Sequence, residues 1–282
     1  MNLPLSLAAE VQRNVLAALV EDIGGGDLTA LLTSAGRRSR GTVVTRENAV
    51  LAGSAWFAAC FRQLDPLAAI RWHAADGATI AAGETLCEIE ASTRALLTAE
   101  RAALNFLQLL SATATATRLY VDAIAGTAAR IVDTRKTLPG LRLAQKYAVT
   151  CGGGSNHRLG LYDGILIKEN HIIAAGGVTA ALQQARAIGR DDVFIQIEVE
   201  TLEQLAEALD AGAKMILLDN MDLTQMRQAV GLTAGRAELE ASGGVSLETV
   251  RTIAETGVDR ISIGGLTKNV RAIDLSLRHS EG

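Results

Sequence analysis

Apolar strand-like segments alternate with amphipathic helical segments after about residue 128, and this alternation restricts the possible folds more than any other feature. Six strands are readable, at 129–133, 164–168, 193–198, 215–219, 237–241 and 260–264. Apolar spacings of three and four residues predict helices between them, for example over 202–211 and 247–255. Strands that alternate with helices build a parallel sheet, because each helix returns the chain to the end of the sheet where the previous strand began. Since a complete barrel has eight strands, the sequence predicts a shortened or open parallel (β/α) barrel.

The first hundred or so residues have a different pattern. Short apolar segments separated by turn residues such as Asp76-Gly77 predict an antiparallel sheet, with strands near 41–46, 49–53, 70–73 and 84–89. A long helix is expected from Ser92, because apolar residues then recur at helical spacing.

These two patterns define an expected α/β protein with two domains. An N-terminal α+β open-sandwich domain is predicted over residues 1–112, joined by the C-terminal segment 269–282. The barrel, with its phosphate-binding loops, is predicted over 113–268.

Reactive side chains follow each of the six predicted barrel strands. The strands end, in chain order, at Asp133 with Thr134, Arg135 and Lys136; at Lys168; at Glu198; at Asp219; at Ser242-Gly243-Gly244; and at Ile263-Gly264-Gly265. In parallel barrels the loops at the carboxyl ends of the strands carry the active site. We therefore expect these groups to share one site.

A group of cations lies between Asp133 and His171. Its members are Arg135, Lys136, Arg142, Lys146, Arg158 and Lys168, with His157 and His171 nearby. Arginine offers a planar fork to carboxylate or phosphate, and lysine a compact charge, so the group suits a multiply anionic ligand. A solvated basic face is the ordinary explanation of such a run, but the strand-end positions favour a site.

Two acids and two glycine-rich loops complete the expected site. Glu198 and Asp219 can hold Mg²⁺, accept ribose hydroxyls or stabilise a cationic sugar, although either alone could be an ordinary salt-bridge partner of Lys168. The loops at 242–244 and 263–265 suit a phosphate, because glycine lets an anion approach backbone N–H groups closely.

Composition excludes several classes of protein. A net charge of −4 and 3% aromatic residues argue against nucleic-acid binding. No apolar stretch is long enough for a membrane span, and the first residues lack the basic lead of a signal peptide. Three widely separated cysteines predict neither a disulfide framework nor a zinc site. We expect a cytoplasmic enzyme.

Several motifs in this chain resemble those of the quinolinate phosphoribosyltransferase family. They are Glu21-Asp22-Ile23-Gly24, Gly26-Asp27-Leu28-Thr29, Glu100-Arg101 with Leu104-Asn105, Asp133 to Gly140, Gly152 to Arg158, Ile167 to His171, Leu217 to Asn220, and Ser242 to Gly244. The resemblance covers nearly the whole chain, and the long central motifs are highly specific.

The resemblance implies a reaction of quinolinate with phosphoribosyl pyrophosphate and Mg²⁺, giving nicotinate mononucleotide, CO2 and pyrophosphate in NAD synthesis. It implies catalytic roles for Lys168, Glu198 and Asp219, with the last two near the metal, directly or through substrate or water. Quinolinate would contact Arg101, Arg135, His157, Arg158 and Lys168. The phosphoribosyl donor would contact Thr134, Lys136, Glu198, Asp219, Ser242, Gly243, Gly244, Ile263, Gly264, Gly265 and Lys268. No organic cofactor is implied.

The resemblance also implies a homodimer or hexamer in which Arg101 reaches into the neighbouring site. One position departs from the family pattern, because Lys268 stands where many members carry histidine. Three alternatives stay open: a related phosphoribosyltransferase with another acceptor, a Schiff-base aldolase using Lys168, and a non-catalytic anion-binding barrel.

Overall fold

The computed structural model describes residues 5–188 and 192–281, which form two compact units. The first unit contains the chain up to Arg118, the segment Thr137–Gly153 and the chain from Thr267 onward. The second contains Leu119–Lys136 and Gly154–Leu266. The division from sequence placed residues 137–153 with the barrel, whereas in the structure this segment packs within the first unit.

The first unit is built on a four-stranded antiparallel sheet in the order β12-β1-β5-β3. These strands are β1 (Arg38–Thr45), β3 (Ala69–Trp72), β5 (Thr85–Ser92) and β12 (Leu275–Glu281), and a small second sheet pairs β2 (Ala49–Val50) with β4 (Thr79–Ile80). The helices α1 (Leu5–Ile23), η1 (Ala30–Leu32), α2 (Ser54–Leu64) and α4 (Arg142–Cys151) belong to this unit, and α3 (Thr93–Ala123) and α10 (Gly265–Lys268) each have residues in both units.

Alternating burial along the strands and one apolar face of α3 create the core of this unit. Along β1 the exposed and more buried residues alternate, as expected for a half-buried strand. The core includes Trp56 and Phe57 of α2 and Leu107 of α3, all fully buried. β12 pairs with β1 from Ser39↔Glu281 to Thr45↔Leu275, so the C-terminal segment completes a sheet begun by the first strand.

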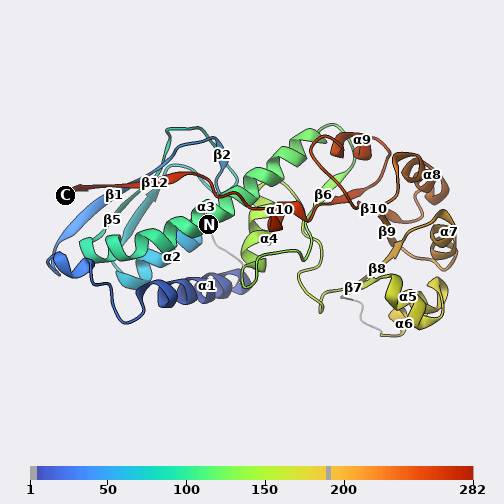
Figure 1. The fold of residues 1–282 in the computed structure, drawn as a ribbon, viewed down its shortest axis with the longest axis horizontal. Coiled ribbons are helices and arrows are strands. Elements are labelled where there is room, and N and C mark those ends of the chain that lie inside the picture. Colours follow the sequence, from blue (N-terminus) through green and yellow to red (C-terminus); the bar gives the residue numbers. More distant parts are fainter. Residues whose placement is uncertain (1–4, 189–191, 282) are drawn as a thin grey trace. The chain divides into compact units, whose positions relative to one another are not determined.

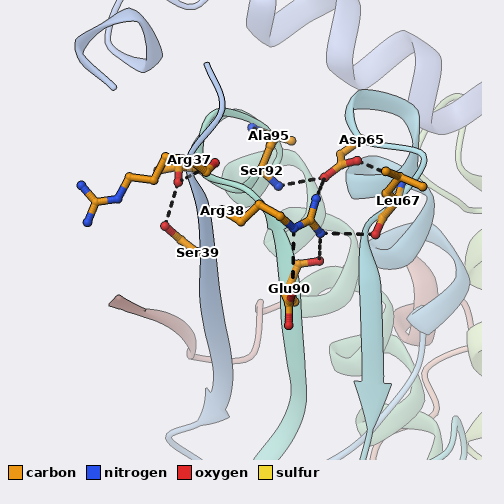
Figure 2. A network of polar contacts seen from close by, with 9 residues as sticks. Arg37, Arg38, Ser39, Asp65, Leu67, Glu90, Ser92 and Ala95 are labelled. Carbon is orange, nitrogen blue, oxygen red and sulfur yellow. Dashed lines mark hydrogen bonds and ion pairs between the residues drawn. The ribbon is translucent and has the colours of Figure 1, made fainter. Parts of the chain in front are cut away.

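A buried carboxylate ties the end of α2 to this sheet (Figure 2). Asp65, the residue that follows α2, accepts hydrogen bonds from the backbone N–H of Ser92 at 2.8 Å and of Leu67 at 2.9 Å. Arg38 on β1 donates to the same carboxylate at 3.3 Å and also reaches the Glu90 carbonyl at 3.3 Å. The pKa of Asp65 is lowered, chiefly by the Ser92 hydrogen bond.

The second unit is a six-stranded parallel sheet in the order β6-β11-β10-β9-β8-β7. Its strands are β6 (Arg130–Val132), β7 (Gly164–Ile167), β8 (Phe194–Val199), β9 (Met215–Asp219), β10 (Glu238–Ser242) and β11 (Arg260–Ser262). Its helices are α5 (Glu169–Ala175), α6 (Val178–Ala187), α7 (Leu202–Asp210), α8 (Leu223–Thr233) and α9 (Val250–Ala254). Figure 1 shows these helices along the outside of the curved sheet.

The predicted shortened, open barrel is therefore confirmed, and all six expected strands are present. Apolar residues such as Ile197, Ile216 and Ala241 alternate along the strands and pack against the helices. The intervening residues point inward, as Glu198 and Glu240 do where they line a cavity. At the start of α7, Thr201 Oγ1 accepts a hydrogen bond from the backbone N–H of Gln204, and the Gln204 side chain accepts one from the backbone N–H of Glu200.

Two further observations concern the described part of the chain. None of its helices combines the length and the apolar character that crossing a membrane requires. The three cysteines are free thiols in the structure, and burial raises the pKa of Cys60 to about 12.

Candidate functional site

A cavity of about 530 Å³ opens at the carboxyl ends of the barrel strands, where the sequence predicts a site. It lies wholly within the second unit. Its lining is Asp133, Thr134, Arg135, Lys136, His157, Arg158, Leu166, Lys168, Glu198, Leu217, Asp219, Asn220, Glu240, Ser242, Gly243 and Ser262.

The cavity brings together ten of the predicted site residues: Thr134, Arg135, Lys136, His157, Arg158, Lys168, Glu198, Asp219, Ser242 and Gly243. Its lining does not include Gly244, Ile263, Gly264 and Gly265, which lie beside it in sequence. Parallel register explains the convergence, because Asp219 pairs with Ser242 on the neighbouring strand and all strand ends point the same way.

Sequence reasoning missed the inner floor of this cavity. Glu240 lies two residues before the predicted site residue Ser242 on β10, so the two share a face, and the period of two along the strand is a signal that could have identified Glu240. Ser262 is the last residue of β11 and directly precedes the predicted loop at 263–265.

Lys168 and Glu198 form a direct ion pair at the mouth of the cavity. The Lys168 ammonium lies 2.7 Å from Glu198 Oε2, with the lysine side chain half exposed and the glutamate side chain only 12% exposed. Lys168 also precedes α5, and its backbone N–H donates to His171 Nδ1 at 2.9 Å. The pair places an ammonium and a carboxylate side by side in the lining of the cavity.

Arg158 is anchored by its backbone and by part of its guanidinium. Nη1 donates to the Gly164 carbonyl at 3.0 Å. The pKa of Arg158 is lowered, first by desolvation and then by the charge of Arg135, while Asp163 opposes the shift. Two arginines held close despite their mutual repulsion favour an anionic ligand between them.

Asp133 and His157 tie two loops of the site together. The buried Asp133 carboxylate accepts a hydrogen bond from the His157 backbone N–H at 2.8 Å. Asp133 N–H also donates to the Ser155 carbonyl, and Ser155 forms a parallel bridge with Val132. The His157 ring is buried as well, with both of its nitrogens in hydrogen bonds.

The first glycine-rich loop has a conformation that only glycine tolerates without strain. Gly243 has φ of +103°, and a Cβ at this residue would lie 2.1 Å from Asn220 Oδ1. The helix predicted over 247–255 begins only at Val250, so loop backbone rather than a helix N-terminus follows Gly244. After β11, in contrast, α10 begins at Gly265.

Two predicted residues, Arg101 and Lys268, lie in the first unit. Arg101 is exposed on α3 and lines a separate cavity of about 370 Å³, formed by α1, α3 and the segment near Gly140. In that cavity Arg13 and Asn14 donate to the Gly140 carbonyl at 2.7 and 3.0 Å. Lys268 is the last residue of α10.

Glu198 and Asp219 offer the site's carboxylates for a metal. Asp219 Oδ2 accepts a hydrogen bond from Asn220 at 2.9 Å, and Glu198 is paired with Lys168. Across the described residues no group of three or more His, Cys, Asp or Glu side chains is arranged to hold a metal ion. The pair fits Mg²⁺ that is bound mainly by substrate phosphates, with one or two protein carboxylates.

Fold and site together define a class: an open parallel α/β barrel with a pocket at its strand ends that is lined by four cationic side chains and several carboxylates. Comparison with known proteins narrows this class. The model of the quinolinate phosphoribosyl transferase C-terminal domain matches residues 113–278, and the model of the N-terminal domain of the same enzyme matches residues 27–111. The chain belongs to the quinolinate phosphoribosyltransferase family.

Individual relatives agree with this assignment. The chain is 42% identical over 258 residues to the probable nicotinate-nucleotide pyrophosphorylase [carboxylating] of Bacillus subtilis, covering 92% of this chain and 89% of the relative. It is 44% identical over 267 residues to the corresponding enzyme of Mycobacterium leprae, with 92% and 94% covered. The solved nicotinate-nucleotide pyrophosphorylase of Francisella tularensis superimposes with a TM-score of 0.94 at 41% identity, covering 99% and 98%.

Proposed function

We propose that this protein transfers a phosphoribosyl group from phosphoribosyl pyrophosphate to the ring nitrogen of quinolinate. The carboxylate beside that nitrogen leaves as CO2 and a proton takes its place, so the products are nicotinate mononucleotide, CO2 and pyrophosphate. This reaction belongs to de novo NAD synthesis. The observation that carries the proposal is a single cavity that joins four cationic side chains to the acid pair Glu198 and Asp219. The names of the relatives support the same reaction.

Quinolinate is a planar dianion, and the paired arginines suit its two carboxylates. Arg135 and Arg158 supply planar forks, and Lys168 supplies a point charge at the cavity mouth. His157 belongs to the same part of the cavity. Arg101 lines a separate cavity in the first unit, and in this proposal a neighbouring copy supplies it to the set.

The phosphoribosyl donor occupies the rest of the site in this proposal. Lys136 faces the pyrophosphate, with Thr134 beside it. Glu198 and Asp219 face the ribose and the metal. The phosphates are bound by backbone N–H groups and side chains of Ser242, Gly243, Gly244, Ile263, Gly264, Gly265 and Lys268.

The charges account for the chemistry without a covalent enzyme intermediate. Departure of pyrophosphate leaves a cationic sugar, which Glu198 and Asp219 stabilise while the quinolinate nitrogen attacks. The quaternary ring nitrogen of the resulting nucleotide then stabilises the carbanion left by CO2. Lys168, held by Glu198 at 2.7 Å, is in place to supply the proton.

Mg²⁺ is the metal proposed for this site, where it would neutralise charge on the departing pyrophosphate. Glu198 and Asp219 would hold it directly or through substrate or water. We also propose a homodimer or hexamer and a cytoplasmic location, although some plant relatives are named as chloroplastic or mitochondrial.

The experiment that tests the proposed reaction is a product balance. Purified protein is incubated with quinolinate, phosphoribosyl pyrophosphate and Mg²⁺, and nicotinate mononucleotide, CO2 and pyrophosphate are measured together. Equal amounts of the three products support the proposal. Pyrophosphate release without CO2 would contradict it.

A further inference from the structure

We propose that Gln196 and Glu240 form a directional hydrogen-bond chain beneath the cavity, which selects one tautomer of His157 and thereby positions Arg158. The inference rests on the proposed role of Arg158 in binding quinolinate. Gln196 and Glu240 are positioning residues in this account, since they act through His157.

The chain of hydrogen bonds crosses the interior of the barrel. Gln196 lies on β8 and Glu240 on β10, two strands that are separated in the sheet by β9. Gln196 Nε2 nevertheless lies 3.1 Å from Glu240 Oε2, and Gln196 Oε1 lies 2.7 Å from His157 Nε2. Three segments distant in sequence are therefore joined through one side-chain amide.

The direction of each bond follows from Glu240. Glu240 Oε2 accepts the hydrogen bond from Gln196 Nε2, so the amide NH2 of Gln196 is turned toward the carboxylate. The carbonyl of Gln196 then faces His157, where it requires a donor. His157 must carry its hydrogen on Nε2.

The other ring nitrogen requires the same tautomer independently. His157 Nδ1 lies 2.7 Å from the backbone nitrogen of Arg158, whose N–H can only donate. A ring nitrogen that accepts a hydrogen bond carries no hydrogen, so the ring is the neutral Nε2–H form. The hydrogen bond to Gln196 and the hydrogen bond from Arg158 therefore require the same tautomer of His157.

Burial makes this directionality costly to violate. Gln196 and Glu240 are each 1% exposed, and His157 is 9% exposed. A reversed amide would place donor against donor where water cannot compensate. Moreover, Glu240 Oε1 has no hydrogen-bond partner among the described residues, while Oε2 accepts from the Gln196 amide and lies 3.7 Å from His157 Nε2.

The hydrogen-bond chain ends at the backbone N–H of Arg158, a predicted substrate-binding residue. The His157 ring accepts from Arg158 N–H while the His157 backbone donates to Asp133 at 2.8 Å. Together these bonds fix the loop that carries Arg158 against the loop that carries Arg135, whose charge repels it. Loss of the tautomer should loosen Arg158 without touching the phosphate loops.

The principal test is Glu240→Gln. The new amide can donate as well as accept, so Gln196 is free to turn over and the bias on His157 is lost. Ring-nitrogen NMR of the ¹⁵N-histidine-labelled free enzyme should show a protonated Nε2 and a bare Nδ1 for His157 in wild type, and a mixed pattern in the variant. The His157 signal is assigned by its loss in His157→Gln.

Kinetics provide the second readout. Small displacements of a positioned group cost up to about a hundredfold, so KM for quinolinate should rise roughly tenfold or more in Glu240→Gln. KM for phosphoribosyl pyrophosphate should stay unchanged. Gln196→Met, which removes both bonds of the amide, should shift quinolinate KM in the same direction and further.

Glu238→Gln is the matched control. Glu238 lies on the same strand and pairs with Arg130 at 2.9 Å and Arg260 at 3.8 Å, outside the chain of bonds to His157. This variant should keep the wild-type kinetics and the wild-type His157 spectrum.

Three results would overturn the inference. One is a His157 protonated on Nδ1 in the folded wild-type enzyme, a measurement that needs no variant to fold. Another is a wild-type spectrum in Glu240→Gln and Gln196→Met, and a third is an equal rise of both KM values. If wild type does not turn over quinolinate, the proposed function fails while the spectrum still decides the tautomer.

Discussion

Among the residues of the proposed site, Arg158 is the one whose role most specifically requires its own side-chain type. One nitrogen of its guanidinium is bound to the Gly164 carbonyl at 3.0 Å, so the rest of the fork is presented from a fixed position. A lysine in its place has one ammonium and cannot both hold that carbonyl and bind a carboxylate in a bidentate manner.

Arg158→Lys should therefore weaken quinolinate binding. A hydrogen bond to a charged group contributes about 1.5–3 kcal/mol, so we expect a rise in quinolinate KM of roughly ten- to a hundredfold with little change for the phosphoribosyl donor. Steady-state kinetics with each substrate varied in turn will measure both. Arg186→Lys is the control, because Arg186 lies on α6 and donates to the Ala211 carbonyl at 2.6 Å. Unchanged quinolinate KM in Arg158→Lys would remove the assigned contact.

At the residue scale, sequence predicted the rim of the cavity better than its floor. Lys168, Glu198 and Asp219 were predictable because they lie at or next to the ends of apolar strands. The hydrogen bond between Gln196 and Glu240 was not predictable, since the two residues lie two strands apart and only the curvature of the sheet brings them together.

Individual elements constrain the site through their backbone, and the turn after β10 is the clearest case. Gly243→Ala should reduce activity strongly, because a Cβ there would meet Asn220 Oδ1 at 2.1 Å and the residue has positive φ. The effect should appear in KM for phosphoribosyl pyrophosphate. Gly231→Ala, within α8 and with open space around it, is the control: it should stabilise the protein by about 0.5–1 kcal/mol in chemical unfolding and leave KM unchanged. Wild-type kinetics in Gly243→Ala would contradict the steric argument.

The end of α2 supports a prediction about pH. The pKa of Asp65 is lowered in the folded protein, so its stabilisation is present above the unfolded pKa of about 4 and is lost as pH falls through the folded value. Asp65→Asn should lower the thermal unfolding midpoint at pH 7, and the difference from wild type should shrink near pH 3. Asp210→Asn, at an exposed ion pair with Arg236, should show little change at either pH. If the unfolding midpoint of Asp65→Asn differed from that of wild type by the same amount at pH 7 and near pH 3, the stabilising role assigned to the Asp65 carboxylate would be refuted.

Elements formed by local patterns were readable from sequence, whereas long-range pairings were not. The strand–helix alternation located all six barrel strands because each depends on a nearby apolar period. β12 pairs with β1 across more than two hundred residues, and no local signal specifies its register. The placement of α4 in the first unit is likewise decided by tertiary packing.

At the scale of the whole molecule, the proposal is that each active site combines residues from two copies of the protein. Arg101 lies in the first unit and Lys168 in the second. If a site uses Arg101 of one copy and Lys168 of another, Arg101→Ala and Lys168→Ala should each be nearly inactive alone. Mixed dimers should recover part of the activity, because one of their two sites then retains both residues. No recovery in dimers verified as mixed by mass spectrometry would exclude the shared site.

The central claim is that the cavity is built for an acceptor with two carboxylates, and acceptor selectivity tests it most directly. Purified protein is given phosphoribosyl pyrophosphate and Mg²⁺ with either quinolinate or nicotinate, and nicotinate mononucleotide is measured in both reactions. The account predicts product from quinolinate and almost none from nicotinate. Product from nicotinate alone would contradict it and indicate a site for a single carboxylate.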